Sequence, residues 1–135
     1  MGVLWTVWPL DEKMKSWLDE TGVEYPAAPS RFPTGSEIKK VVASFKEGFD
    51  VKINDNGLNG PWQASIVSKA GGDTGEWALL NISEYSGDDQ EQELWFEKGW
   101  ESLNVKILKE LSLHSGPLVL LADTGEEPIV ISNAT

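Results

Sequence analysis

"FDVKINDNGLNGPWQASIVSKAGGDTGEWALLNISEYSGDDQEQELWFEK" (residues 49–98) decides the fold, because apolar and polar residues alternate there in four short runs. Alternation with a period of two is typical of strands that bury one face. Clusters rich in Gly, Asn and Asp separate the runs at 54–61, 71–75 and 86–90, and such clusters form turns. Because short connections favour antiparallel neighbours, we predict a four-stranded meander.

Helical and strand patterns flank this meander on both sides. The order of predicted elements is β-α-α-β-β-β-β-α-β-β, which indicates a single α+β domain over residues 1–135 with helices packed on an antiparallel sheet. Prolines at 26, 29 and 33 make the segment between the first two helices an extended connector. The elements outside the meander are a strand around 3–7, a helix from Asp11 to about Glu20, a helix after a capping box of Thr34 and Glu37, a helix at 100–114 and strands at 117–122 and 128–131.

Composition limits the partners and the chemistry of this chain. The 135 residues include 22 acidic and 11 basic side chains, which give a net charge of −11, and no cysteine. Without cysteine there is no thiolate chemistry, iron–sulfur cluster or cysteine-bound zinc. The negative charge repels nucleic acid and anionic membranes and speeds the encounter with basic partners. With no signal-peptide pattern and no membrane-spanning run, we expect a soluble cytoplasmic protein.

Two motifs suggest catalysis and are better explained by local structure. "VLLADTGEEPIVI" (119–131) contains the Asp-Thr-Gly of aspartic protease loops. Those proteases need two facing aspartates, whereas Asp123-Thr124-Gly125 also suits a tight turn between two strands. His114 is the only histidine, and it ends a predicted helix where the helix dipole favours a cation. We interpret Asp123 as a turn residue and predict no catalytic role for either residue.

Metal and cofactor motifs are incomplete. The segment around Asn54, Asn56 and Gly57 approaches the calcium-loop pattern, but Lys52 and Gln63 occupy its first and twelfth ligand positions. No glycine-rich phosphate loop is present, and one histidine cannot build a site that needs two. We therefore predict no catalytic residues, no metal ligands and no cofactor, which favours a non-enzymatic protein without excluding an enzyme.

Seven tryptophans are the least ordinary feature of the composition. Trp95 points away from Leu94 and Phe96 on the predicted strand 91–98, and Trp77 similarly opposes its neighbours on 76–85. Either helices bury both faces of the sheet, or one face exposes indole rings ringed by acids and serves as a partner surface. The sequence leaves these two arrangements open.

The main functional hypothesis is binding of another, basic protein. In character (small, acidic, cysteine-free and single-domain) the chain resembles bacterial antitoxin and immunity proteins, which use acidic faces to cap basic nuclease-type toxins. The resemblance is one of character and rests on no motif. It implies a site in which acids steer the partner and an indole anchors it. The candidate partner-binding residues are Asp88, Asp89, Glu91, Glu93 and Trp95.

Two rival hypotheses remain open. A small-molecule-binding protein or weak enzyme would use a pocket between sheet and helices lined by Trp62, Trp77 and Trp100. Its anion-binding group would be Arg31, the only arginine and so the only guanidinium fork in the chain. Alternatively, the aromatic face serves only to form a homodimer.

Overall fold

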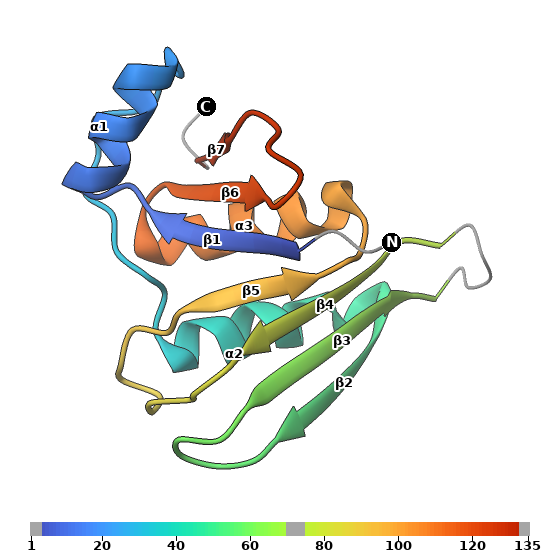
Figure 1. Cartoon of the computed structure of the whole chain (residues 1–135). Helices are drawn as coiled ribbons and strands as arrows, with labels where there is room; N and C mark the ends of the chain where they lie inside the picture. Colours follow the sequence, from blue (N-terminus) through green and yellow to red (C-terminus); the bar gives the residue numbers. More distant parts are fainter. Residues whose placement is uncertain (1–3, 70–74, 133–135) are drawn as a thin grey trace.

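A seven-stranded antiparallel sheet runs through the computed structural model, which describes residues 4–69 and 75–132 (Figure 1). The strand order across the sheet is β2-β3-β4-β5-β1-β6-β7. The predicted α+β class, the meander and the order of elements are confirmed, with one short 3-10 helix added after the second helix. Of the turn predicted at 71–75, residues 71–74 lie outside the described residues. The strands are β1 (Leu4–Pro9), β2 (Phe49–Asp55), β3 (Trp62–Ser68), β4 (Trp77–Ile82), β5 (Leu94–Glu97), β6 (Leu118–Ala122) and β7 (Ile129–Ile131). The helices are α1 (Glu12–Thr21), α2 (Gly35–Ser44), η1 (Phe45–Glu47) and α3 (Glu101–Ser115).

Strand β1 joins the meander to the last two strands. Trp5 lies opposite Phe96 of β5 on one side and opposite Ala122 of β6 on the other. The first strand of the chain is therefore central in the sheet, between elements about 90 and 115 residues further along.

The predicted helix signals are present in the structure. The Asp11 side chain accepts a hydrogen bond from the Met14 N–H at 2.9 Å, and Gly22 ends α1 with φ of 77°. Thr34 and Glu37 form the predicted capping box, in which each side chain accepts from the other's backbone N–H. Gly22 at the end of α1 and the capping box at the start of α2 therefore set the two ends of the extended connector between these helices.

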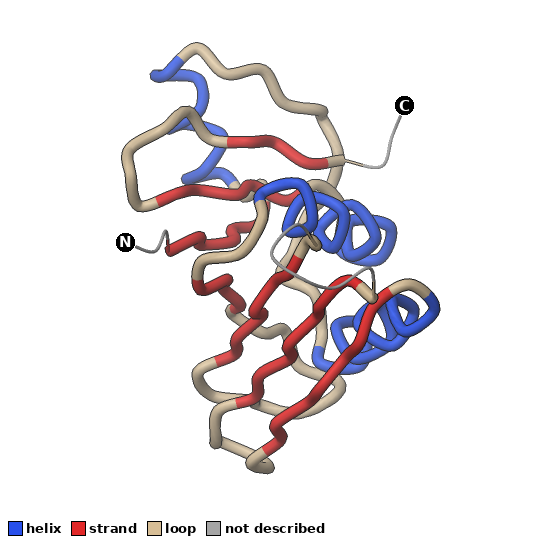
Figure 2. The backbone as a smooth tube through the Cα atoms, turned by 90° about the vertical axis from the view of Figure 1, so that its right-hand side faces the viewer, coloured by secondary structure: helices blue, strands red, loops and turns tan. Residues whose placement is uncertain are grey.

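Helices α2 and α3 cover one face of the sheet and bury the main core (Figure 2). The alternating residues Ala64, Leu80 and Phe96 lie in register on this face and are fully buried. Helix α1 packs on the opposite face, but only over β6 and β7, where Leu18 contacts Val119 in a second small core. No helix in the described ranges is long and apolar enough to span a bilayer.

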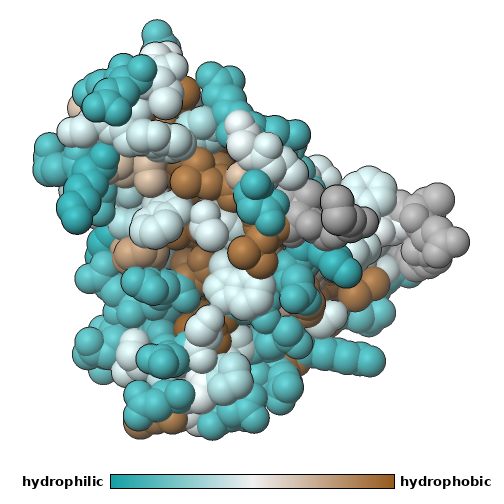
Figure 3. All heavy atoms as spheres, in the orientation of Figure 1, coloured by the Kyte–Doolittle hydropathy of each residue, from teal (hydrophilic) through white to brown (hydrophobic). Residues whose placement is uncertain are grey.

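No helix among residues 4–69 and 75–132 covers the opposite face over β1 to β5, which is called the open face below. Residues whose side chains lie on it include Trp8, Trp77 and Trp95, and Trp77 is 36% exposed. Figure 3 shows apolar and near-neutral side chains running across this face between hydrophilic ones. Of the two arrangements that the sequence left open, the structure has the one in which part of a sheet face exposes indole rings.

Candidate functional site

A groove opens on the open face beside the start of β5. At this point the connector takes the place of β1 as the neighbouring segment. Strand β1 pairs with β5 only as far as Thr6, which lies opposite Trp95, and then continues beside β6 to Pro9. Before β5 begins, Glu91 is bridged instead to Thr34 of the connector. The cavity between β1, the connector and the loop at 83–93 has a volume of about 620 Å³.

The floor of this groove is apolar and aromatic. Trp8 is 42% exposed and Leu4 is 40% exposed, so both present apolar surface to solvent. The indole N–H of Trp8 donates to Thr6 Oγ1 at 3.0 Å, which satisfies its polar edge within the protein. The apolar lining residues are Leu4, Val7, Trp8, Phe32, Leu94 and Trp95.

The rim carries Glu84, Glu91 and Glu93, and none of the lining residues that the structure describes is basic. Across residues 4–69 and 75–132, no cation lies within ion-pair distance of these three carboxylates. The cations that do form ion pairs are committed to other acids, such as Lys39 to Asp88 at 2.9 Å. The rim therefore places three carboxylates without an ion pair beside apolar surface; Arg31 interacts electrostatically with Glu91 but forms its ion pair with Glu37.

Gln92 holds the loop that carries the rim. Its side chain is buried, at 1% exposure, inside a stretch of charged and polar residues. Its amide oxygen accepts from the Ser86 N–H at 3.1 Å, and its Nε2 donates to the carbonyls of Gly87 at 2.7 Å and Gln90 at 3.0 Å. One side chain thus replaces the backbone pairing that a regular strand would provide.

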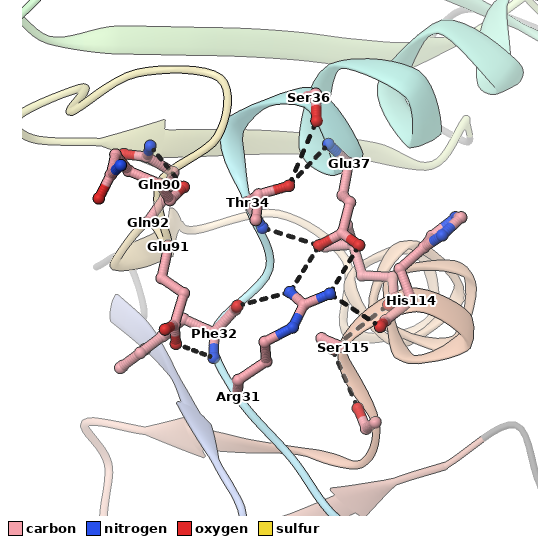
Figure 4. Close-up of polar contacts among 12 residues, drawn as sticks. Arg31, Phe32, Thr34, Ser36, Glu37, Gln90, Glu91, Gln92, His114 and Ser115 are labelled. Atoms are coloured by element: carbon pink, nitrogen blue, oxygen red, sulfur yellow. Dashed lines mark hydrogen bonds and ion pairs between the residues drawn. The ribbon is translucent and has the colours of Figure 1, made fainter.

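Arg31 ties the connector to α2 and α3 (Figure 4). Its guanidinium donates to both carboxylate oxygens of Glu37, at 2.7 and 2.9 Å, and to the carbonyl of His114 at 3.1 Å. The hydrogen bonds from Arg31 lower the pKa of Glu37 to about 2. The next residue, Phe32, donates its N–H to Glu91 Oε1 at 3.0 Å, so this network also positions one rim acid.

The structure brings together three of the five predicted partner-binding residues. Glu91, Glu93 and Trp95 line the groove, and the Trp95 indole N–H donates to Ser83 Oγ at 3.1 Å. Asp88 lies outside the groove, where it accepts from the Tyr85 hydroxyl and pairs with Lys39. The hydrogen bond from Tyr85, followed by that from Lys39, lowers the pKa of Asp88.

Asp89 is exposed in the same turn as Asp88 and does not line the groove. The two aspartates therefore differ in position from Glu91 and Glu93, although these four acids lie within six residues in the sequence.

The residues of the predicted small-molecule pocket do not line one cavity. Trp62 is 1% exposed beneath the helices, whereas Trp77 lies on the open face of the sheet. Trp100 precedes α3 and is 41% exposed. Both arms of the Arg31 fork are occupied by Glu37, so its role in the structure is to hold the connector.

Several groove residues were missed by the sequence reasoning. Leu4 and Trp8 carry a usable signal, since apolar side chains at alternate positions of β1 point away from the buried Trp5 and Val7. Phe32 and Glu84 carry none, because they reach the groove through the meeting of segments about 50 residues apart. Gln92 gives no signal either, as it looks like one more polar residue in an acidic turn.

Local structure accounts for Asp123-Thr124-Gly125 and for His114, for which the sequence predicted no catalytic role. Asp123 is exposed in the turn between β6 and β7, and Gly125 has φ of 82°. This confirms the turn interpretation of Asp-Thr-Gly. His114 is exposed near the end of α3. Within the described part of the chain, no group of three or more His, Asp or Glu side chains is arranged to hold a metal ion.

Comparison with known proteins finds no family model, no curated protein and no solved structure that matches this chain. The geometry and charge of the groove are therefore the basis for a functional proposal.

Proposed function

We propose that this protein binds a basic segment of another protein in the acidic groove. The observation that carries the proposal is an exposed aromatic floor beside three rim carboxylates, Glu84, Glu91 and Glu93, that form no ion pair among residues 4–69 and 75–132. A complementary ligand presents apolar side chains to the floor and Lys or Arg side chains to the rim.

The two parts of the groove contribute in different ways. Burial of apolar surface is worth roughly 25 cal/mol per Å², so the indoles of Trp8 and Trp95 supply most of the binding energy. The rim acids add selectivity and a faster encounter, since charge complementarity acts more on association than on affinity. The net charge of −11 extends this attraction for basic partners and repels polyanions.

An immunity-like or antitoxin-like role is the most specific form of the proposal. It rests on the groove together with the small, acidic, cysteine-free character of the chain. The partner would be a basic protein, such as a nuclease-type toxin, and this chain would act by covering it and would catalyse no reaction. The cytoplasm is the compartment we propose for this encounter.

The test is affinity capture from the native cell lysate at physiological salt with the tagged protein and three variants, followed by mass spectrometry. Glu93→Lys changes the rim, and Trp95→Ala removes part of the floor. The matched control is Glu110→Lys on the exposed side of α3, which alters net charge by the same amount as Glu93→Lys. We expect a basic protein that is retained by wild type and Glu110→Lys and lost with both groove variants.

Retention of the same proteins by wild type and by Glu93→Lys would show that the groove is not the binding site. Asp89→Lys adds a further comparison, because Asp89 lies in the adjacent turn but outside the groove. If the site is confined to the groove, this variant behaves like the Glu110→Lys control.

The volume of the groove also supports a second candidate, a small organic cation as ligand. Small-molecule sites have volumes of about 300–1,000 Å³ and apolar linings with a few polar groups, and the groove falls in that range at about 620 Å³. In that case tryptophan fluorescence responds to an aromatic ammonium compound such as benzyltrimethylammonium, the response is lost in Trp95→Phe, and no protein is captured.

A further inference from the structure

Strand β2 forms the long edge of the sheet. Its one neighbour among the described strands is β3, and Figure 1 shows it at the outer margin of the sheet. It has seven residues, whereas β7 at the other edge has three. A long edge strand presents a row of backbone N–H and C=O groups on which another strand can pair.

The side chains of β2 carry a self-complementary pattern. Asp50 and Lys52 lie opposite Val67 and Ser65 of β3, on the open face of the sheet, while the alternate residues Phe49, Val51 and Ile53 lie on the helix face. Neither Asp50 nor Lys52 has an ion-pair partner within the parts of the chain that the structure describes. Ile53 is 46% exposed, so an apolar side chain at this edge also lacks cover.

We propose that β2 pairs antiparallel with β2 of a second copy of this chain, with Val51 opposite Val51 of the copy. In this register Asp50 of each copy lies opposite Lys52 of the other, which makes two ion pairs on the open face. Phe49 lies opposite Ile53 twice on the helix face and covers its exposed surface. Opposite charges and apolar pairs directly across antiparallel strands are stabilising.

The alternative registers lose this complementarity. A shift by two residues in one direction places Lys52 opposite Lys52, and a shift in the other direction places Asp50 opposite Asp50. Like charges directly opposite each other are destabilising. A shift by one residue would move the apolar side chains to the open face. Asp50 and Lys52 therefore stabilise the register with Val51 opposite Val51 and destabilise the registers shifted by two residues.

The proposed dimer is independent of the groove. Strands β3 and β4 separate β2 from β5, so the groove stays accessible when the edge is paired. Each copy has a charge of −11, and this general repulsion opposes association. At physiological salt the screening length is about 8 Å, which weakens that repulsion more than it weakens contacts between facing strands. We expect a reversible dimer whose population rises with protein concentration.

A single introduced thiol tests the register, because the chain has no cysteine. Residues directly opposite in an antiparallel pair have Cα atoms about 4.5–5.5 Å apart, within the range that a disulfide spans. Val51→Cys places the two thiols opposite each other, so mild oxidation gives a covalent dimer. Ile53→Cys is the control, because its two thiols lie four residues apart along the strands, or about 13 Å.

Charge exchange tests the ion pairs by analytical ultracentrifugation at physiological salt. Asp50→Lys alone and Lys52→Asp alone each place like charges opposite each other, and we expect both to be monomers near 14.9 kDa. An equimolar mixture of these two variants restores opposite charges across the strands and gives a heterodimer of twice that mass. The double variant Asp50→Lys with Lys52→Asp restores the homodimer. Both sites are exposed, and circular dichroism verifies that the variants fold.

The proposal is overturned if the wild type stays monomeric at several hundred micromolar, if Ile53→Cys crosslinks as fast as Val51→Cys, or if the mixed variants do not associate. None of these outcomes bears on partner binding in the groove, which is measured with different variants.

Discussion

Replacement of Glu37 by Gln isolates the charge of the Arg31–Glu37 pair. A glutamine at this position still completes the capping box with Thr34, so the substitution removes the carboxylate and leaves the helix start intact. The pKa of Glu37 falls from 4.5 to about 2 in the folded protein, which corresponds to about 3 kcal/mol of stability. Because the Arg31 side chain is 41% exposed, solvent screening reduces this figure, and we expect about 2 kcal/mol at pH 7.

The loss of stability caused by Glu37→Gln should depend on pH. A carboxylate whose pKa is lowered on folding contributes stability that is fully present above its unfolded pKa, near 4.5, and is lost as the pH falls through its folded pKa, about 2. The difference in unfolding free energy between wild type and Glu37→Gln should therefore be constant from pH 7 to about pH 5. It should shrink below pH 4.5 and approach zero near pH 2. Other carboxylates lower the stability of both proteins in acid, but they cancel in the difference.

Urea denaturation followed by tryptophan fluorescence at pH 7, 5, 3.5 and 2.5 measures this difference. Glu110→Gln, at an exposed position of α3, is the control and should change stability by less than about 0.5 kcal/mol. A Glu37→Gln effect below about 0.5 kcal/mol at pH 7, or one that does not change down to pH 2.5, would refute the reasoning. The first result would mean that the bidentate pair is no stronger than an ordinary surface ion pair.

Three further predictions concern the backbone, the groove loop and the core. Gly116→Ala should destabilise the protein by more than about 3 kcal/mol in thermal or urea unfolding, because its φ is 85° and a Cβ would lie 2.0 Å from the Pro29 carbonyl oxygen. Gly125→Ala, with φ of 82° and no atom within 4 Å of the added Cβ, should cost only about 1 kcal/mol. Gln92→Ala should weaken partner capture and increase amide hydrogen exchange at 84–91, whereas a loss of overall stability with unchanged exchange there would contradict its role in the loop. Phe96→Ala, at a fully buried site, should cost about 3–5 kcal/mol with a lower denaturation midpoint, and a cost below about 1 kcal/mol would contradict the core assignment.

The elements of the fold could be predicted because their signals are local. The alternation in 49–98 and the turn clusters define β2 to β5, and the capping box of Thr34 and Glu37 defines the start of α2. These signals depend on neighbours within a few residues, so a sequence displays them directly. The position of β1 between β5 and β6 depends on packing across the whole chain, and no local pattern specifies it.

The groove could be predicted only in part for the same reason. Glu91, Glu93 and Trp95 are close in the sequence, and their acidic and aromatic character predicted a surface site there. The rest of the groove depends on where β1 leaves β5 and on where the connector takes its place. The Arg31 fork shows the limit of reasoning from residue type, because the sequence offers it as a ligand group and the fold assigns it to Glu37.

The acidity of the groove arises from the distribution of charge as well as from its total. Seven of the eleven basic residues lie on helices: Lys13, Lys15, Lys39, Lys40, Lys46, Lys106 and Lys109. Three others lie in connections, and Lys52 is the one basic residue in the described strands. It lies at the β2 edge, three strands away from β5 in the sheet order.

Because none of the described residues lining the groove is basic, the two proposed interfaces on the open face have different charge patterns. The groove has acids that form no ion pair, which is why we propose a basic partner for it. The β2 edge has one acid and one cation on neighbouring same-face positions and is therefore complementary to itself. A second copy of this acidic chain would be repelled from the groove rim but matched at the edge. In our proposals the groove binds a different protein and the edge binds an identical one, so variants at one interface should leave the other intact.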